Sequence, residues 1–121
     1  MPKILIVEDE GDLRELMAKT LQESGYDVGA CDTGRTVLSA AAEFKPDLIL
    51  LDIMLPGVDG LALAQQMSED PVLSKIPVIA VSALENTRKQ LEMLPQTCGF
   101  ISKPFSMSVL VAKIKEVLAP R

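Results

Sequence analysis

The sequence predicts an α/β protein of the (βα)5 type, a doubly wound five-stranded parallel sheet with helices on both faces. Short, unbroken apolar runs recur along the chain between turn or charged residues, as in strands that are buried on both faces. Segments with apolar residues at helical spacing alternate with these runs, which is the pattern of βα units. The 121 residues suit one hydrophobic core, so we expect residues 1–121 to form a single domain.

The first βα unit is expected in residues 3–25. Lys-Ile-Leu-Ile-Val at 3–7 is typical of a buried strand, and three acidic residues close it. From 10 to 24 apolar residues recur at helical spacing, and Gly25 is a natural stop for that helix. The apolar positions are Leu13, Leu16, Met17 and Leu21.

The second unit and the central strand follow. Residues 27–31 predict a weaker strand, and Gly34 begins a helical segment that ends at Pro46. The four apolar residues of 48–51 run directly into Asp52, which predicts a buried strand with a carboxylate at its end. One side of the preceding helix is expected to consist of Val37, Leu38, Ala41 and Ala42.

The third unit continues after a loop signal at 56–60, and the fourth unit follows it. A helix is expected at 61–69, broken by Asp70-Pro71, and a buried strand at 77–81 that ends at Ser82. Residues 85–94 are helix-prone but poorly amphipathic. The inward positions expected of these two helices are Leu61, Ala64, Met67, Leu91 and Leu94.

The fifth unit closes the chain. Residues 100–102 predict a short strand that runs into Lys103-Pro104, and Ser106 is expected to cap the last helix. The spacing of that helix predicts core packing by Leu110, Val111, Ile114, Val117 and Leu118.

The polar strand ends predict a site. Right-handed crossovers favour the flavodoxin-like strand order 2-1-3-4-5, in which strands 1 and 3 flank the switch point where open α/β sheets bind ligands. Glu8, Asp9 and Asp52 would then converge at one edge of the sheet. Ser82 and Lys103 would border the same crevice.

This cluster suits phosphoryl chemistry. Three close carboxylates need a counter-charge, and Mg2+ binds to one or two carboxylates while it reaches phosphate oxygens. An Asp beside such a cation can attack a phosphoryl donor, and the product then needs positive charge and donors around it. Lys103, the Ser82 hydroxyl and the backbone N–H of Ala83 are groups of the right types.

Composition excludes several other functions. The net charge of −5 argues against direct nucleic-acid binding. Because there is no His, Ser-His-Asp and Cys-His catalysis are excluded, and a metal site must be built from oxygen. No apolar run approaches the roughly 20 residues of a membrane span. With no signal peptide, we expect a cytoplasmic protein with free thiols at Cys31 and Cys98.

Four motifs then match a known family. They are Ile6-Val7-Glu8-Asp9, the stretch from Pro46 to Gly60, Val81-Ser82-Ala83, and the stretch from Phe100 to Phe105. Over essentially its whole length the chain resembles a response-regulator receiver domain of two-component signal transduction, of the chemotaxis-regulator type. Each motif is weak alone, whereas the four together in this spacing are highly specific.

The resemblance implies a role for each site residue. Asp52 is similar to the phosphoacceptor, and Mg2+ would be held by Glu8, Asp9, Asp52 and the backbone carbonyl of Met54. Phosphoryl contacts would come from Ser82, the Ala83 N–H and Lys103, and the Lys103-Pro104 peptide bond would be cis. The phosphoryl donor would be a histidine kinase or a histidine phosphotransfer protein. Such a domain is not an enzyme beyond catalysing its own phosphorylation and dephosphorylation.

The resemblance also implies a switch. Phosphorylation would draw Ser82 inward and let Phe100 turn in, which changes the surface of helix 4, strand 5 and helix 5 for a downstream protein target or effector domain. The family's Ala-Gly-Ala before strand 5 is replaced by residues 94–99, so the end of helix 4 is expected to be irregular. Apolar Met54 and Leu84 would flank the phosphoryl group and exclude water, so we expect slow self-dephosphorylation.

Two other functions compete with this one. The first is a pseudo-receiver, a constitutive interaction module, although such domains commonly lose one of the five site residues that are intact here. The second is a flavin-binding domain of the same fold, which needs a Ser/Thr/Gly-rich phosphate cradle where this chain has carboxylates. Whether the domain acts alone, as part of a longer protein or as a phosphorylation-dependent homodimer is left open.

Overall fold

The five strands form one parallel sheet in the order β2-β1-β3-β4-β5, as the sequence predicts. A computed structural model describes residues 2–31, 36–52, 60–82 and 97–119. The strands are β1 (Lys3–Val7), β2 (Asp27–Cys31), β3 (Leu48–Asp52), β4 (Val78–Ser82) and β5 (Thr97–Ser102). The helices are α1 (Gly11–Glu23), α2 (Val37–Phe44), α3 (Gly60–Glu69), α5 (Met107–Leu118) and a short 3-10 helix, η2 (Leu73–Lys75).

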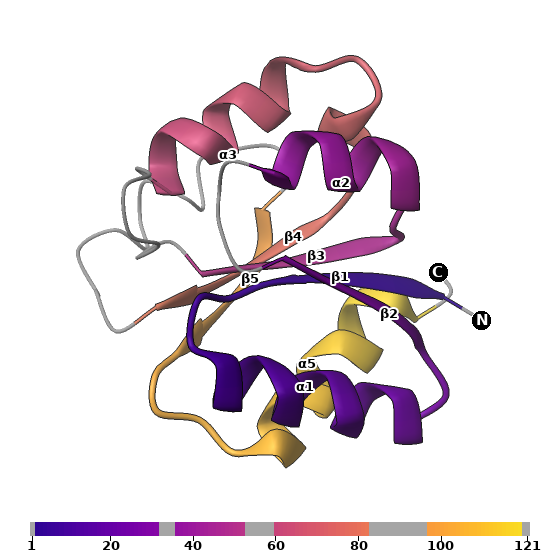
Figure 1. Ribbon diagram of the computed structural model, residues 1–121, viewed down its shortest axis with the longest axis vertical. Helices are drawn as coiled ribbons and strands as arrows, with labels where there is room; N and C mark the ends of the chain where they lie inside the picture. Colours follow the sequence, from indigo (N-terminus) through magenta and orange to yellow (C-terminus); the bar gives the residue numbers. More distant parts are fainter. Residues whose placement is uncertain (1, 32–35, 53–59, 83–96, 120–121) are drawn as a thin grey trace.

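Two helix layers cover the sheet. Figure 1 shows α1 and α5 on one face and α2 and α3 on the other. In Figure 1 the sheet separates the two layers, so every central strand has helices above and below it. This arrangement explains why β1 and β3 are apolar throughout rather than alternating with polar residues.

The core therefore has two halves. Successive strand residues point to opposite faces. Thus Leu5 and Val7 of β1 join the cluster beneath α2 and α3, whereas Ile4 and Ile6 join the cluster beneath α1 and α5. Residues 48–51 of β3 are each at most 1% exposed. Full burial of each such side chain contributes about 1.5–3 kcal/mol, which fixes β3 as the central strand.

Each helix contributes a few residues to these clusters. Met17 and Leu21 of α1 are buried as predicted, and so is Met67 of α3. In α5, Leu110 and Ile114 are buried, and three more predicted residues pack against them partly buried: Val111, Val117 and Leu118.

Some apolar positions of the expected helices do not face the core. Leu16 is 50% exposed on α1, and Leu38 is 36% exposed on α2. Ala42 is exposed as well. The inward side of α2 is formed by buried Val37 and Ala41, with Ala40 and Phe44 packing partly buried against the same cluster. Leu63 of α3 is buried although it was not predicted. The side chains of Leu61 and Ala64 lie outside what the structure describes, and so do Gly34 and residues 85–94.

Two helix ends adopt left-handed backbone. Gly25, just after α1, has φ 97°, which agrees with its predicted role as a stop. Lys45 has φ 54° at the C-cap of α2, where its N–H donates to the carbonyl of Ala41. At the start of α5, the Ser106 hydroxyl accepts a hydrogen bond from the N–H of Val109 at 3.2 Å, as expected of an N-cap.

The segment between α3 and β4 was not predicted as a helix. Asp70 accepts hydrogen bonds from the N–H groups of Val72 and Leu73 at 2.8 and 3.0 Å, and these bonds start η2. They lower the pKa of the Asp70 carboxyl below its usual value. The buried side chain of Leu73 then anchors η2 to the core. No helix in the described ranges has the length and apolarity to cross a bilayer.

Candidate functional site

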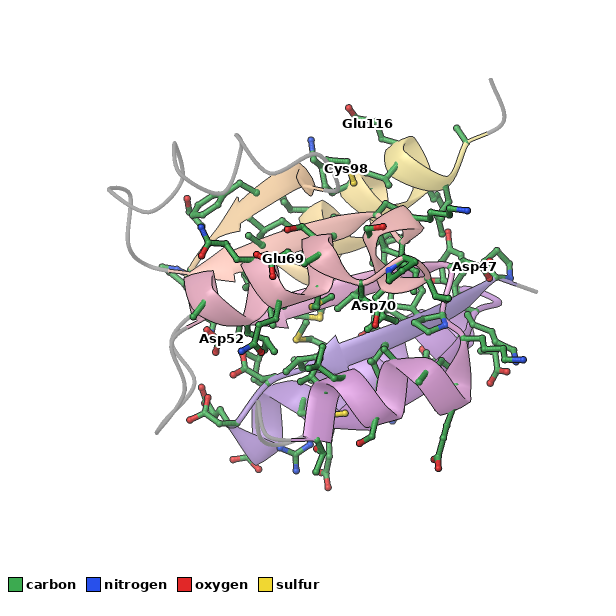
Figure 2. The ribbon with its side chains drawn as sticks, turned by 90° about the horizontal axis from the view of Figure 1, so that it is seen from above. Asp47, Asp52, Glu69, Asp70, Cys98 and Glu116 are labelled. Atoms are coloured by element: carbon green, nitrogen blue, oxygen red, sulfur yellow. The ribbon has the colours of Figure 1, made fainter. Side chains whose placement is uncertain are left out.

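The carboxyl ends of β1 and β3 place two carboxylates next to each other. Val7 pairs in register with Leu51, so Glu8 and Asp52 come next on the two neighbouring strands. Figure 2 shows Asp52 at one end of β3 and Asp47 at the other. The site therefore lies at the edge where open α/β sheets bind ligands.

Glu8, Asp9 and Asp52 converge, as predicted. One carboxylate oxygen of each lies within 4.8 Å of the others. Glu8 is 1% exposed and Asp52 is 3% exposed, whereas Asp9 is exposed to solvent. Two of the three charges are thus removed from water, which is costly unless cations compensate them.

Lys103 supplies a compensating cation. Its ammonium lies 2.7 Å from Oε1 of Glu8 and 3.0 Å from Oδ2 of Asp52. Lys103 follows β5 directly, and its side chain is 25% exposed. The Lys103–Pro104 peptide bond is cis, as the resemblance implies.

Burial and mutual contacts shift the pKa values of Glu8 and Lys103. Desolvation, followed by contact with Asp52, raises the pKa of Glu8 to about 7, although Lys103 opposes the shift. For Lys103 itself, burial works against the charged form, but hydrogen bonds to Glu8 and Asp52 raise the pKa of the ammonium. Around neutral pH the site therefore has an incompletely compensated negative charge that a further cation would stabilise.

The acidic loop, residues 8–10 between β1 and α1, is also held by hydrogen bonds to its backbone. The N–H of Glu8 donates to the carbonyl of Cys31 at the end of β2 at 3.1 Å. The carbonyl of Glu8 accepts a hydrogen bond from Nη1 of Arg14 at 2.9 Å. Sequence reasoning missed Arg14. The available signal was a basic residue one turn into the helix that follows the acidic loop.

The remaining predicted site residues are placed only in part. Ser82 ends β4 and pairs in register with Ser102 of β5, but its side chain lies outside the described part of the structure. Phe100 pairs with Ala80 and packs, partly buried, against the core beneath α2 and α3. Three predicted contributions lie outside the described residues: the backbone carbonyl of Met54 as a metal ligand, the N–H of Ala83 as a phosphoryl donor, and the apolar cover from Met54 and Leu84.

The donor set fits a hard divalent cation. All three side chains of the acidic cluster offer carboxylate oxygens, the ligands that Mg2+ prefers. Within the residues that the structure describes, the Asp9 carboxylate has no ion-pair partner. Its solvent-exposed position lets a bound cation keep water ligands, as Mg2+ usually does.

Comparisons with known proteins agree on one family. The family model of the response regulator receiver domain matches residues 4–115. The polar-differentiation response regulator DivK of Brucella anthropi is 38% identical over 120 residues, which cover 98% of both chains. The phosphate regulon transcriptional regulatory protein PhoB of Pseudomonas aeruginosa is 38% identical over 116 residues, 95% of this chain and 51% of PhoB.

A solved structure agrees with these sequence relatives. The response regulator TrrA of Thermotoga maritima, determined in complex with Mg2+ and BeF, superposes with a TM-score of 0.85 and 30% identity. The match covers 98% of this chain and 100% of TrrA. The chain spans about half the length of the first curated relatives it matches, but nearly all of DivK.

Proposed function

Because the chain belongs to the response regulator receiver domain family, we propose that Asp52 is its phosphoacceptor and that Mg2+ is its cofactor. One observation carries the proposal: three carboxylates from two strand ends lie within 4.8 Å of one another, and Lys103 bonds to two of them. The structure of TrrA with Mg2+ and BeF shows that a similar chain takes up a cation together with a fluoride compound.

The proposed reaction transfers a phosphoryl group to Asp52. An oxygen of Asp52 attacks phosphorus, the P–N bond of a phosphohistidine breaks, and the leaving imidazole keeps the bonding electron pair. The contact of Lys103 with an Asp52 oxygen supports a role for its ammonium in neutralising charge on the incoming group. The Ser82 hydroxyl and the Ala83 N–H would contribute further donors.

The metal would be held by Asp9, Asp52 and the carbonyl of Met54, with Glu8 acting through water. Bound there, Mg2+ supplies positive charge that offsets the phosphoryl oxygens and brings the donor close to Asp52. The burial of Glu8 and Asp52 supports this role, since the single positive charge of Lys103 does not fully compensate two neighbouring buried carboxylates.

The proposed output is a change in protein contacts. Ser82 would turn toward the phosphoryl group, and Phe100 would move deeper into the structure from its partly buried position. The altered surface would include β5 and α5 and would control a downstream target, an attached effector domain or a second copy of the chain. The kinase or phosphotransfer partner would act in the cytoplasm, where thiols such as Cys31 and Cys98 stay reduced.

Intact-mass analysis after incubation with acetyl phosphate and Mg2+ tests the proposal. We expect one phosphoryl adduct in the wild-type chain and none in Asp52→Asn or without Mg2+. Asp47→Asn is the matched control, since it changes a carboxylate at the opposite end of the same strand (Figure 2) and should keep the adduct. An unmodified wild-type chain would instead support the pseudo-receiver, and an adduct that persists in Asp52→Asn would refute the assignment.

A further inference from the structure

Arg14 lies beside the acidic cluster but binds to none of its carboxylates. Its Nη1 donates to the backbone carbonyl of Glu8 at 2.9 Å and to that of Asp9 at 3.5 Å. It makes no ion pair with any residue in the described ranges. A guanidinium in contact with two acidic residues would ordinarily be expected to bond to a carboxylate rather than to the backbone.

The local fold explains this choice of partner. Arg14 stands in the first turn of α1, where its own N–H donates to the carbonyl of Glu10 at 2.9 Å. Side chains of a helix point back toward its N-terminus, so that of Arg14 extends over the preceding loop. The carbonyls of Glu8 and Asp9 are the acceptors that it meets there.

The result is a clamp on the backbone of Glu8. The N–H of Glu8 is held by the carbonyl of Cys31 at 3.1 Å, and its carbonyl is held by Arg14 at 2.9 Å. Glu10 adds a weaker contact, because its N–H donates to Oε2 of Glu8 at 3.4 Å. Among these groups only Arg14 contacts the carbonyls of both acidic residues.

We infer that Arg14 is a positioning residue for the metal site, which fixes the backbone of Glu8 and Asp9 while leaving their carboxylates available to the cation. The inference rests on the proposed function, since it concerns the same site. By contrast, Lys103 occupies carboxylate oxygens of Glu8 and Asp52 directly. The two cations therefore have different roles: Lys103 compensates charge, whereas Arg14 orders the loop.

A role of Arg14 through its charge and a role in positioning the loop predict opposite changes in Mg2+ affinity for the neutral variant Arg14→Met. If Arg14 acted only through its charge, removing it would reduce repulsion and tighten Mg2+ binding. If Arg14 positions the backbone of Glu8 and Asp9, its removal weakens Mg2+ binding. Losing a group that orients a metal ligand typically lowers metal affinity by at least about tenfold. The direction of the change thus decides between the two roles.

Titration calorimetry with MgCl2 on the full chain makes the measurement. We expect Arg14→Met to bind Mg2+ about tenfold more weakly, and Arg14→Lys, which keeps the charge but loses the fork of donors, to fall between it and wild type. Lys19→Met is the matched control, because it removes one positive charge from an exposed position of the same helix. Its Mg2+ affinity should be unchanged or slightly higher.

Two further readouts separate the possible failures. With acetyl phosphate, the Mg2+ concentration for half-maximal phosphorylation should rise in Arg14→Met, while the rate at saturating Mg2+ stays within about twofold of wild type. If Arg14→Met does not fold by circular dichroism, Arg14→Lys decides. Wild-type or tighter Mg2+ binding in the folded variant overturns the inference, whereas a wild-type chain that takes up no phosphoryl group overturns the proposed function instead.

Discussion

The ammonium of Lys103 lies 2.7 Å from Oε1 of Glu8, a carboxylate that is only 1% exposed. The same ammonium contacts Asp52 at 3.0 Å, so it joins the end of β5 to the ends of β1 and β3. Removing one partner from such a buried arrangement leaves uncompensated charge, which costs far more than losing a surface pair.

Lys103→Met should therefore destabilise the metal-free protein by about 2–4 kcal/mol. Two buried carboxylates would face each other without a cation, and added Mg2+ should restore more stability to this variant than to the wild type. Urea unfolding with EDTA and with excess Mg2+ measures both effects. Lys113→Met is the matched control, since Lys113 is about as exposed as Lys103 but its partner Glu116, 3.8 Å away, is 71% exposed. Equal losses in the two variants would contradict the prediction.

The raised pKa of Glu8 predicts a pH dependence. The pKa of its carboxyl is raised from the ordinary 4.5 to about 7 in the folded chain, because burial disfavours the carboxylate. The folded state then binds more protons than the unfolded state between these values, so stability falls as pH rises from about 4.5 to about 7. The full effect is at most about 3 kcal/mol, present below pH 4.5 and lost above pH 7.

Urea titrations between pH 5 and pH 8 in EDTA measure this slope. Glu8→Gln should flatten it and should be more stable than the wild type at pH 8, because the amide has no charge to bury. Excess Mg2+ should also reduce the slope, since cation binding favours the carboxylate form. An unchanged slope in Glu8→Gln would show that another group causes the pH dependence.

Much of this fold could be predicted because its signals are local. The apolar runs at 3–7 and 48–51 are long enough to specify strands buried on both faces, and each leads into a carboxylate. Parallel strands place their carboxyl ends at one edge, so the convergence of Glu8 and Asp52 followed from strand order alone.

Other features depend on tertiary contacts that periodicity does not encode. Leu38 and Ala42 fit a helical apolar stripe, yet α2 turns the face of Val37 and Ala41 toward the core and leaves both exposed. The burial of Leu63, by contrast, does follow from periodicity, because Leu63 lies four residues before Met67 and shares its face of α3; the prediction of Leu61 and Ala64 passed over it. The hydrogen bond from Arg14 to the Glu8 carbonyl could not be predicted from a sequence motif, because every residue has a backbone carbonyl whatever its side chain.

The N-cap of α5, which the sequence predicts and the structure shows, gives a prediction about stability. Ser106→Ala should cost about 1 kcal/mol of unfolding free energy, because the N–H of Val109 loses its acceptor. Ser68→Ala is the control, a serine within α3 whose hydroxyl donates to the carbonyl of Gln65. It should be neutral or slightly stabilising, since Ala is the better helix former. Thermal unfolding of both variants gives the comparison, and a larger loss in Ser68→Ala would argue against the cap.

Lys45 gives the last prediction, a gain in stability. With φ 54°, it holds a left-handed conformation that costs a residue with a Cβ about 1–2 kcal/mol. Lys45→Gly removes this cost, part of which is offset because glycine makes the unfolded chain more flexible. We therefore expect a net gain of about 0.5–1 kcal/mol in urea unfolding. Lys45→Ala is the control that removes the ammonium but keeps the Cβ. If the strain is responsible, only the glycine variant gains stability, whereas equal gains would point to the charge of Lys45 instead.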